Sequence, residues 1–462
     1  MMHLLLAVPL GFVATTQSRV VAKPRRSCTH PTCQFDNVPS LGKLNPFRPA
    51  ADPNVPLKIG IVGGGPGGLA LAHALRTLPG PQRVGSVQVY DRGGILAPGV
   101  GGGFQLSCGA ATLQQLGIDI TKVASPLRSV LSRRPDGTEL LSLDIQASML
   151  EADAPLLNDQ DATFAVMRSS LQSLLAEQLP DEGVLQLGRK VTAARPNGAG
   201  RVTLSFDDGS PDETPDLVVG CDGIASVVKQ GCFPDEPPPT YSGVKIIFAV
   251  GPAGTRPKGT EDAFHQWLGD GAYCLSASYG GENDCLALCY ADDNPASENA
   301  GWQDAGEARG ALEARLRSAK MPDEVLKVAM AAERLYETSV YFRQPSAAWY
   351  TSDGGAVLLG DAAHAMPPFL GQGANQALCD AYRLAAELKQ VGGEHKSVTD
   401  ALRAYQNKRW FATTRLQLNS RILGFLETQS GPGALFRDAF FFTTGKLGIA
   451  KKVFLDAATL KA

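Results

Sequence analysis

The chain lacks an excess of charge of either sign. Its 462 residues include 43 Lys and Arg against 46 Asp and Glu, for a formal net charge of -3. A protein that neutralises many nucleic-acid phosphates needs clustered basic charge, so no nucleic-acid partner is expected. Hydrophobic residues make up 44% of the sequence, which is enough to build a large core, and a folded enzyme is the prediction.

The sequence also lacks any C-x-x-C pair. Its 9 cysteines are dispersed and odd in number, which fits reduced thiols in a reducing compartment better than a disulfide framework. Cys28, His30 and Cys33 lie close together, but no second pair of ligands stands at a spacing suited to zinc. No metal site is therefore predicted.

No apolar run is long enough to cross a bilayer, so no transmembrane segment is expected in the mature chain. Leu4–Ala14 has the outline of a signal peptide, and no acidic residue precedes Asp36, as in organelle transit peptides. Residues 1–56 are therefore interpreted as a targeting presequence and linker. Import into a plastid is the prediction, and a secretory or cytoplasmic location is the alternative.

Glycine is abundant, with 50 residues, and one cluster of it forms a motif. From Leu57 to Leu75 a β-branched run changes into an Ala/Leu-rich helical pattern, which predicts a strand, a tight turn and a helix. Gly63, Gly65 and Gly68 occupy the glycine positions of a dinucleotide-binding fingerprint. The first permits the turn, the second lets backbone approach a pyrophosphate, and the third allows the helix to pack closely on the strand.

A second predicted strand, Ser86–Tyr90, ends in Asp91 at the spacing typical of the acid that binds an adenosine ribose. A glycine-rich turn alone can serve packing, but strand, turn, helix and terminal acid in register favour a dinucleotide site. Because Arg92 follows directly, a 2′-phosphate and hence NADP stays open for this motif taken alone.

Two more apolar runs end in turns that carry glycine and aspartate. One ends at Asp222 and Gly223, the other at Gly360 and Asp361, and each leads into a helical pattern. Three such turns favour one shared ligand.

The order of these segments resembles the FAD-binding monooxygenase family of single-component aromatic hydroxylases, with relatives of salicylate hydroxylase, kynurenine monooxygenase and zeaxanthin epoxidase. The likeness runs from about Leu57 to about Gly424. It implies an α/β fold in which a Rossmann-like FAD-binding domain is built from discontinuous segments, with a β-sheet substrate domain and C-terminal helices. The expected parts are residues 57–236 for the first part of the FAD domain, 237–345 for the substrate-binding sheet region, and 346–462 for the second part of the FAD domain with the C-terminal helices.

The family pattern implies a role for each matching residue. The ADP half of FAD is implied to lie against Gly63, Gly65, Gly68 and Asp91, and its phosphates or ribityl chain near Arg168, Gly360 and Asp361. The residues implied to border the flavin ring are Gln105, Pro367, Gly371, Gln372, Gly373 and Asn375. Asp222 and Gly223 are implied to lie between FAD and a transient NAD(P)H.

The Asp-Gly motif departs from the family pattern, because Ala225 replaces a charged residue and Lys229 replaces an arginine. No second G-x-G-x-x-G is present, so no separate nicotinamide-binding domain is expected. The family chemistry implies that NAD(P)H, FAD and O2 serve to hydroxylate or epoxidise a hydrophobic or aromatic small molecule. A dehydrogenase or reductase without oxygen insertion is the alternative, and a non-catalytic FAD-binding protein is less favoured because the flavin-ring segment is intact.

Four other features have weaker interpretations. His364 is expected to pack or to contact flavin rather than to act as a base. The strand pattern Phe264–Trp267 has two interpretations: some of its side chains line a substrate pocket, or they pack in the core. The arginine-rich stretch 401–421 is expected to form a solvated helix face. The apolar tail Leu435–Phe442 is expected to pack in the core, with a docking helix or a peripheral membrane contact as its alternative. The sequence does not predict a catalytic residue, a particular substrate or an oligomeric state.

Overall fold

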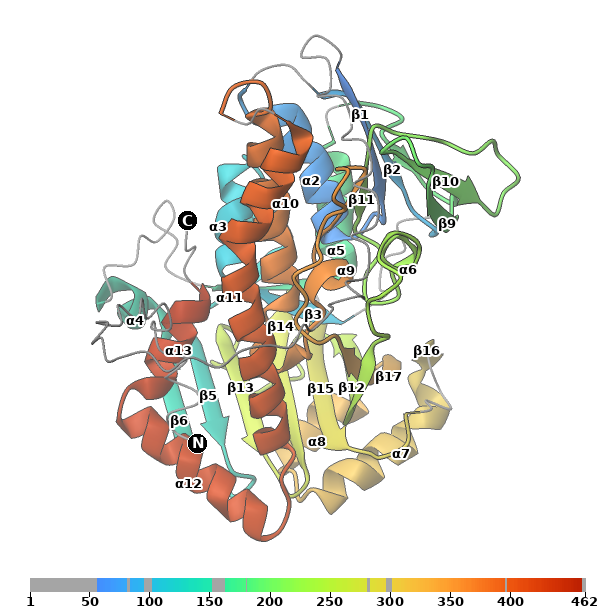
Figure 1. The fold of residues 1–462 in the computed structure, drawn as a ribbon. Helices are drawn as coiled ribbons and strands as arrows, with labels where there is room; N and C mark the ends of the chain where they lie inside the picture. The colour runs from blue at the N-terminus through green and yellow to red at the C-terminus, as the bar shows by residue number, and fades with distance from the viewer. Residues whose placement is uncertain are drawn as a thin grey trace, which may run out of the picture. The chain divides into compact units, whose positions relative to one another are not determined.

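The computed structural model describes residues 56–80, 84–94, 102–151, 163–179, 181–280, 283–295, 301–394 and 397–458. The predicted presequence lies outside them, apart from Pro56. Within the described residues the chain forms β-sheets flanked by helices, which is the α/β fold that the sequence predicts (Figure 1). None of the described helices has the length and apolarity that a bilayer crossing requires.

A parallel sheet carries the glycine-rich fingerprint. Among the described residues it has five strands in the order β18-β11-β1-β2-β8, each paired in parallel with its neighbours. These strands are β1 (Leu57–Val62), β2 (Val84–Tyr90), β8 (Leu185–Gln186), β11 (Leu217–Gly220) and β18 (Ala356–Leu358). Every side chain of β11 and β18 is buried, as is typical of parallel strands covered on both faces.

Helices from distant parts of the chain pack around this sheet. They are α2 (Pro66–Thr77), α3 (Cys108–Gln115), α5 (Arg168–Glu177), α6 (Val227–Cys232), α9 (Asp361–His364), α10 (Gly373–Lys389) and α11 (Val398–Glu427). Helix α2 lies between the sheet and α10, and it buries every residue from Gly67 to Leu75. A helix that is apolar on all sides belongs in the core, so the Ala/Leu-rich pattern and the observed burial agree.

Two small sheets join this part of the fold. One is an antiparallel sheet of β3 (Gly103–Leu106), β7 (Thr163–Met167) and β4 (Ala124–Leu127). The other is a hairpin of β9 (Val191–Pro196) and β10 (Val202–Phe206). Two short 3-10 helices, η1 (Ile120–Lys122) and η3 (Pro368–Leu370), complete the connections among the described residues. Strand β3 places Gln105 next to the segment that leads into α10.

A larger mixed sheet forms the second half of the molecule. Its eight described strands run β16-β17-β12-β15-β14-β13-β5-β6. They are β5 (Ser129–Arg133), β6 (Glu139–Asp144), β12 (Thr240–Pro252), β13 (Ala263–Leu268), β14 (Ala272–Tyr279), β15 (Asn283–Ala291), β16 (Gly301–Asp304) and β17 (Arg334–Phe342). The predicted region 237–345 omits β5 and β6. They belong to this sheet because β5 pairs in parallel with β13, a long-range contact that no local pattern signals.

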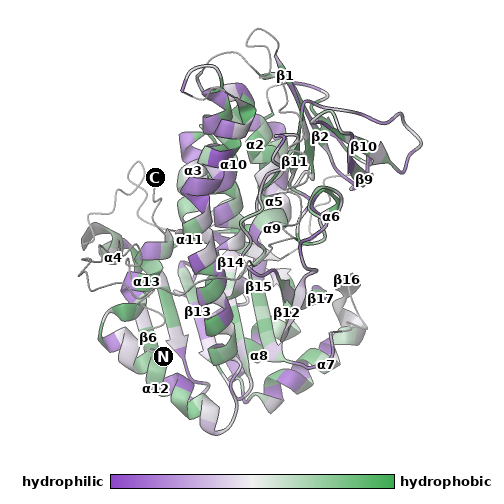
Figure 2. Ribbon diagram, viewed as in Figure 1, coloured by the Kyte–Doolittle hydropathy of each residue, from purple (hydrophilic) through white to green (hydrophobic). Residues whose placement is uncertain are grey.

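Alternate side chains of this sheet face different layers. Ile247 and Ala249 of β12 belong to a core that includes residues of α7 (Ala305–Ser318) and α8 (Asp323–Met330). Ile246 and Phe248 belong to a cluster with residues of α11 and α12 (Pro432–Lys446). The remaining described helices are α4 (Ile145–Glu151) and α13 (Ile449–Ala458), which contact each other. Figure 2 shows hydrophobic colour along much of the strands between these layers.

Candidate functional site

Three strands of the parallel sheet end side by side. Val62 of β1 is paired with Gly220 of β11, which is paired with Leu358 of β18. The turns that follow therefore meet at one edge, and an ideal Cβ on Gly63 would lie 3.0 Å from Asp222 Cα. The predicted convergence of the three turns is confirmed.

The three fingerprint glycines have different surroundings. Gly63 has φ +106°, and a Cβ there would lie 2.5 Å from the carbonyl oxygen of Cys221. A Cβ on Gly68 would lie 2.1 Å from the carbonyl oxygen of Gly63, whereas one on Gly65 would meet no atom within 4 Å. Two of the glycines thus permit close packing, while the third leaves open space at the N-terminus of α2. This arrangement fits the pyrophosphate of a dinucleotide.

Asp91 lies against the fingerprint loop. One carboxylate oxygen accepts a hydrogen bond from Gly64 N at 2.7 Å and the other accepts one from Gly93 N at 2.7 Å. The carboxylate is therefore fixed beside the loop, and its role toward a ribose stays a prediction.

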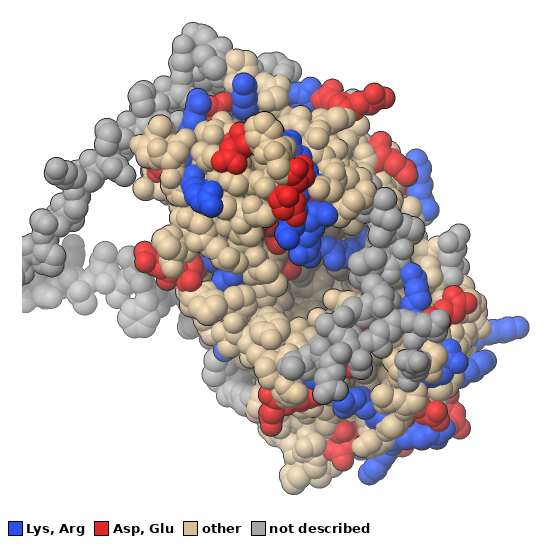
Figure 3. All heavy atoms as spheres, turned by 90° about the vertical axis from the view of Figure 1, so that its right-hand side faces the viewer, with Lys and Arg blue, Asp and Glu red and all other residues tan. Residues whose placement is uncertain are grey.

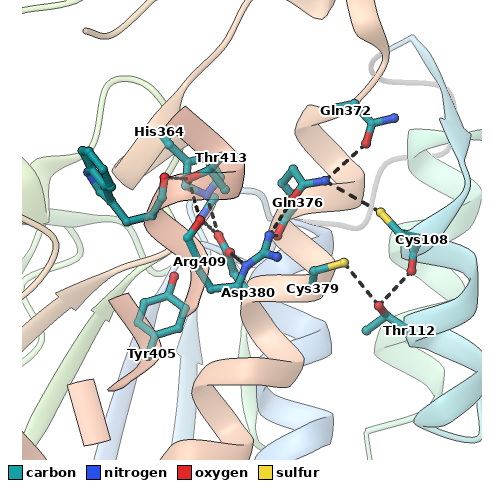
Figure 4. A network of polar contacts seen from close by, with 12 residues as sticks. Cys108, Thr112, His364, Gln372, Gln376, Cys379, Asp380, Tyr405, Arg409 and Thr413 are labelled. Atoms are coloured by element: carbon teal, nitrogen blue, oxygen red, sulfur yellow. Dashed lines mark hydrogen bonds and ion pairs between the residues drawn. The ribbon is translucent and has the colours of Figure 1, made fainter. Parts of the chain in front are cut away.

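The turn at Gly360 is held by a buried network (Figure 4). Asp380 of α10 accepts a hydrogen bond from Gly360 N at 3.1 Å, and its carboxylate lies 2.6 Å from His364 Nε2 and 2.7 Å from Arg409 Nε. Burial raises the pKa of Asp380, but His364 and Arg409 outweigh burial and hold that pKa at about 2. The anion therefore persists and orders the turn.

The carboxyl of Asp361 lies at this same edge and remains accessible to solvent. A Cβ on Gly373 would lie 3.8 Å from Asp361 Oδ1. The surrounding protein limits hydration and raises the pKa of Asp361, while His364 and Arg168 lower it. The structure thus brings Asp361 near Gly373 and Arg168, three residues that the sequence predicts to hold the cofactor.

Asn375 is buried and fully hydrogen bonded. Its Oδ1 accepts from Ser107 N at 2.8 Å and Gly109 N at 2.9 Å, and its Nδ2 donates to the carbonyl oxygens of Gln105 and Gly371 at 2.8 and 2.9 Å. Since an amide has this capacity and no more, Asn375 ties two loops together instead of offering polar atoms to a ligand. Asn375 therefore supports the loops beside the predicted position of the flavin ring.

Gln105 has a polar atom in need of a partner. Its Nε2 is buried without a hydrogen bond to any described residue, and its Oε1 lies 3.5 Å from the Cβ position of Gly371. A buried, unpaired donor is costly and calls for an explanation such as a bound group. The donor fits a flavin ring between β3 and the loop before α10.

The remainder of the loop before α10 is held by hydrogen bonds from α10 and α11. The Pro367 carbonyl accepts a hydrogen bond from Ser420 Oγ at 2.6 Å, and Gln372 Oε1 accepts one from Gln376 Nε2 at 3.2 Å. The loop is therefore held by α10 and α11, the two helices that also supply Asp380 and Arg409.

The Asp-Gly turn also contains an unpaired atom. Asp222 Oδ2 accepts hydrogen bonds from Val227 N at 2.7 Å and Val228 N at 3.3 Å, while its Oδ1 is buried without a partner in the described structure. Burial raises the pKa of this carboxyl. Lys229 is buried and lies 3.1 Å from Glu236, so this replacement for the usual arginine is committed to an internal ion pair.

Sequence reasoning missed the residues that support the site. Asp380 carried no motif, and Arg409 lies in the stretch expected to be a solvated face. That expectation is wrong for Arg409, which is buried, although it holds for the exposed Arg403. The one available signal was the register of α10, which places Asp380 four residues after Gln376 on a buried face. His364 packs against Trp349, as expected for a packing role.

An apolar sheet face adjoins the cofactor edge. A Cβ on Gly102 would lie 2.6 Å from the Phe248 ring, and one on Gly103 would lie 2.0 Å from the Tyr279 ring. Phe369 of η3 stacks edge-on with Tyr273, with ring centroids 6.4 Å apart. Figure 3 shows a hollow in the surface on the side that carries α6 and β16 in Figure 1, with basic side chains along one rim.

Strand β13 divides its side chains between two layers. Gln266 faces α11, where its Nε2 donates to Glu427 Oε1 at 2.6 Å. Trp267 faces α8 and donates to Glu324 Oε1 at 3.1 Å. All four residues of the Phe264–Trp267 pattern are buried, as a core role requires, and pocket lining by any of them stays a prediction.

The described cysteines are free thiols, and the described residues contain no cluster of three or more His, Cys, Asp or Glu suited to a metal ion. Cys28, His30 and Cys33 lie outside the described residues.

Comparison with known proteins matches residues 57–419 to the model of a family described as FAD binding domain. The chain is 30% identical over 400 residues to 3-amino-4-hydroxybenzoate 2-monooxygenase PtnB3 of Streptomyces platensis, covering 84% of this chain and 93% of that protein. It is 29% identical over 377 residues to the chloroplastic zeaxanthin epoxidase of Capsicum annuum, covering 77% of this chain and 53% of that protein.

Solved structures share the fold. HpxO of Klebsiella pneumoniae in complex with FAD and uric acid has a TM-score of 0.71 at 20% identity, covering 87% of this chain and 96% of that chain. A salicylate hydroxylase substrate complex has a TM-score of 0.66 at 21% identity, covering 88% of this chain and 99% of that chain.

Proposed function

This chain belongs to the FAD-binding monooxygenase family, and on that premise we propose that it uses NAD(P)H and O2 to hydroxylate or epoxidise a hydrophobic or aromatic small molecule. The observation that carries the proposal is the junction of two surfaces. The edge that fits FAD, with the unpaired Gln105 Nε2 and Asp222 Oδ1, adjoins an apolar sheet face through β3 and η3.

Each part of this junction has a chemical task. Bound FAD would supply the redox chemistry and the activation of O2. The open backbone at Gly65 and the N-terminus of α2 would hold its pyrophosphate, and Asp361 would hold its ribityl chain. The N-terminus of α10 at Gly373 would stabilise negative charge on the ring.

The apolar face would orient the substrate and exclude water. Phe248 and Tyr279 pack directly against β3, so a ligand beside Gln105 would meet aromatic and aliphatic side chains on its other side. Exclusion of water favours oxygen transfer to substrate over wasteful release of H2O2. The two enzyme names above, an aminohydroxybenzoate monooxygenase and a carotenoid epoxidase, support both aromatic and polyene substrates as candidates.

A substrate screen tests the proposal. The purified protein should carry flavin, and aminohydroxybenzoates, phenols, quinones and carotenoids would be tested for stimulated NAD(P)H oxidation, O2 uptake and an oxygenated product. A true substrate should give one oxygenated product per O2 consumed. Reduction of a substrate with no O2 incorporated would favour the reductase alternative, and a protein that binds no added FAD would overturn the proposal.

We also propose plastid import, supported by the composition of residues 1–56 and by the chloroplastic relative. Residues 1–56 fused to a fluorescent protein should direct it into plastids in an algal or plant cell. Fluorescence in the secretory pathway or the cytoplasm would contradict this location.

A further inference from the structure

Helix α12 turns two of its charged side chains inward and three of its large apolar side chains outward. Arg437 and Asp438 are buried, whereas Leu435 is 67% exposed and Phe436 is 54% exposed. A surface helix normally turns its apolar face to the core, so this arrangement is the reverse of the usual one. The core packing expected for Leu435–Phe442 is therefore wrong for most of its large side chains, and Phe441 is the buried exception.

Hydrogen bonds fix this rotation of the helix. Arg437 donates from Nη1 to the carbonyl oxygen of Gly269 at 2.7 Å and from Nη2 to that of Leu268 at 3.2 Å. Asp438 accepts from Arg437 Nε at 2.9 Å and from Arg134 Nε at 2.8 Å. Rotation by one residue, about 100°, would bury Phe436 but would strip these partners from two buried charges. The exposure is thus built into the fold.

The exposed apolar residues lie on one face. Leu435, Phe436 and Phe442 follow helical spacing, and Lys446 continues the same row, with its Nζ 5.7 Å from the centroid of the Phe442 ring. Leu447, just past the helix, is also exposed. We call Leu435, Phe436, Phe442 and Leu447 the α12 stripe.

The segment that carries the α12 stripe has more basic than acidic residues. From Thr428 to Ala458 its basic residues are Arg437, Lys446, Lys451 and Lys452, and its acidic residues are Asp456 and Asp438, which is buried between two arginines. Asp270, from another part of the chain, accepts a hydrogen bond from Gly431 N at 2.9 Å at the start of α12. Lys446 and Lys452 are exposed in the same segment. Apolar side chains bordered by lysines suit the headgroup region of an anionic bilayer.

We propose that the α12 stripe is a docking surface for an anionic lipid bilayer, with its Leu and Phe side chains among the headgroups and Lys446 and Lys452 against lipid phosphates. Helix α12 runs along the outer margin of the fold beside β6, away from the edge of the parallel sheet that fits FAD (Figure 1). Docking therefore leaves that edge free. The proposal stands whether or not the enzymatic proposal holds.

Vesicle flotation of the full chain loaded with FAD tests this docking. The probes are vesicles of phosphatidylcholine alone and of phosphatidylcholine with phosphatidylglycerol in equal parts. The protein should float with the anionic vesicles and bind neutral ones about tenfold or more weakly, since each lysine near the surface contributes to the attraction. The double variant Leu435→Ser, Phe436→Ser should bind anionic vesicles at least about tenfold more weakly than the parent.

Two matched variants make the result specific. Phe411→Ser removes a 55%-exposed phenylalanine of α11, outside the stripe, and should leave flotation within about twofold. Lys446→Gln combined with Lys452→Gln should reduce the preference for anionic vesicles about tenfold. All variants share the same N-terminal segment, so differences among them report the substituted side chains.

Other results would overturn the proposal. The double serine variant should keep the thermal unfolding and flavin content of the parent, because both side chains are exposed. If that folded variant still floats like the parent, the stripe is not a lipid-docking surface. The same conclusion follows if neither protein binds vesicles and the parent is a dimer that the substitutions convert into a monomer.

Discussion

The two halves of this molecule position functional groups by different means. In the parallel sheet, backbone at three strand ends makes the site, and Gly63 and Gly68 sit where a Cβ would come within 2.5 and 2.1 Å of a carbonyl oxygen. In the eight-stranded sheet, side chains such as Phe248 and Tyr279 form the face toward β3. Only glycine fits the first kind of position, whereas many apolar residues fit the second. A cofactor site built on such glycines can therefore be recognised in a sequence, whereas a surface built from apolar side chains is much harder to recognise.

The two halves also treat buried acids differently. Asp380, in α10 beside the parallel sheet, is paired with His364 and Arg409, and its pKa is held at about 2. Glu427, at the end of α11, accepts a hydrogen bond from Gln266, and burial raises its pKa to about 8 although Gln266, Tyr273 and Arg437 oppose the rise. Asp380 is thus buried in its charged form and Glu427 in its neutral form.

Asp380→Asn should have the largest effect, because it removes the anion and leaves Arg409 buried without its partner. Breaking a buried pair in this way costs about 3–5 kcal/mol, so the free energy of unfolding should fall by that amount and flavin retention should fall with it. Urea unfolding and flavin absorbance measure the two effects. The exposed pair Arg317–Glu313 gives the control, since Glu313→Gln should cost less than about 1 kcal/mol. Equal losses of unfolding free energy in the two variants would show that Asp380 does not order the turn at Gly360.

Glu427→Gln should have the next largest effect, and its sign depends on pH. The folded pKa of about 8 lies above the ordinary value of 4.5, so the folded chain holds a proton that the unfolded chain releases. Parent stability should therefore fall by about 1.4 kcal/mol per pH unit between these two values. Glutamine stays neutral and can still accept from Gln266, so the variant should lose this slope and exceed the parent by roughly 2–3 kcal/mol near neutrality. Unfolding curves at several pH values measure it, and parallel pH profiles would show that Glu427 is ionised in the fold.

The same contrast explains how much the sequence could predict. The strand, turn and helix around Gly63 and the strand ending in Asp91 are both present, because turn glycines and local periodicity encode them. The pairing of β5 with β13 was missed, since it joins distant segments that have no shared pattern. Arg409 was misread for another reason: whether an arginine is buried depends on partners from other elements. Propensity and pattern do not contain that information.

Gly68→Ala and Gly65→Ala form a matched pair that separates folding from cofactor binding. The added methyl at Gly68 meets backbone 2.1 Å away, so we expect a loss of about 1–3 kcal/mol of stability in the free protein. At Gly65 the methyl meets nothing within 4 Å, so the stability of the free protein should stay within about 0.5 kcal/mol while the affinity for FAD falls. Denaturation of the flavin-free proteins and titration with FAD distinguish the two. Unchanged FAD affinity in Gly65→Ala would show that the pyrophosphate does not bind at this loop.

Gln105→Leu should have the smallest effect on the fold and still weaken the cofactor site. The side-chain amide of Gln105 is a buried donor without a partner, so an apolar side chain of similar size loses no hydrogen bond there, and the stability of the flavin-free protein should change by less than about 1 kcal/mol. If that donor serves an acceptor on the flavin ring, its loss should weaken FAD binding about tenfold, which equals about 1.4 kcal/mol. It should also shift the visible spectrum of the bound flavin, a change that a purely structural residue would not produce. FAD affinity and spectrum matching those of the parent would place the ring elsewhere, and the edge formed by Gln105 and Gly371 would then belong to packing alone.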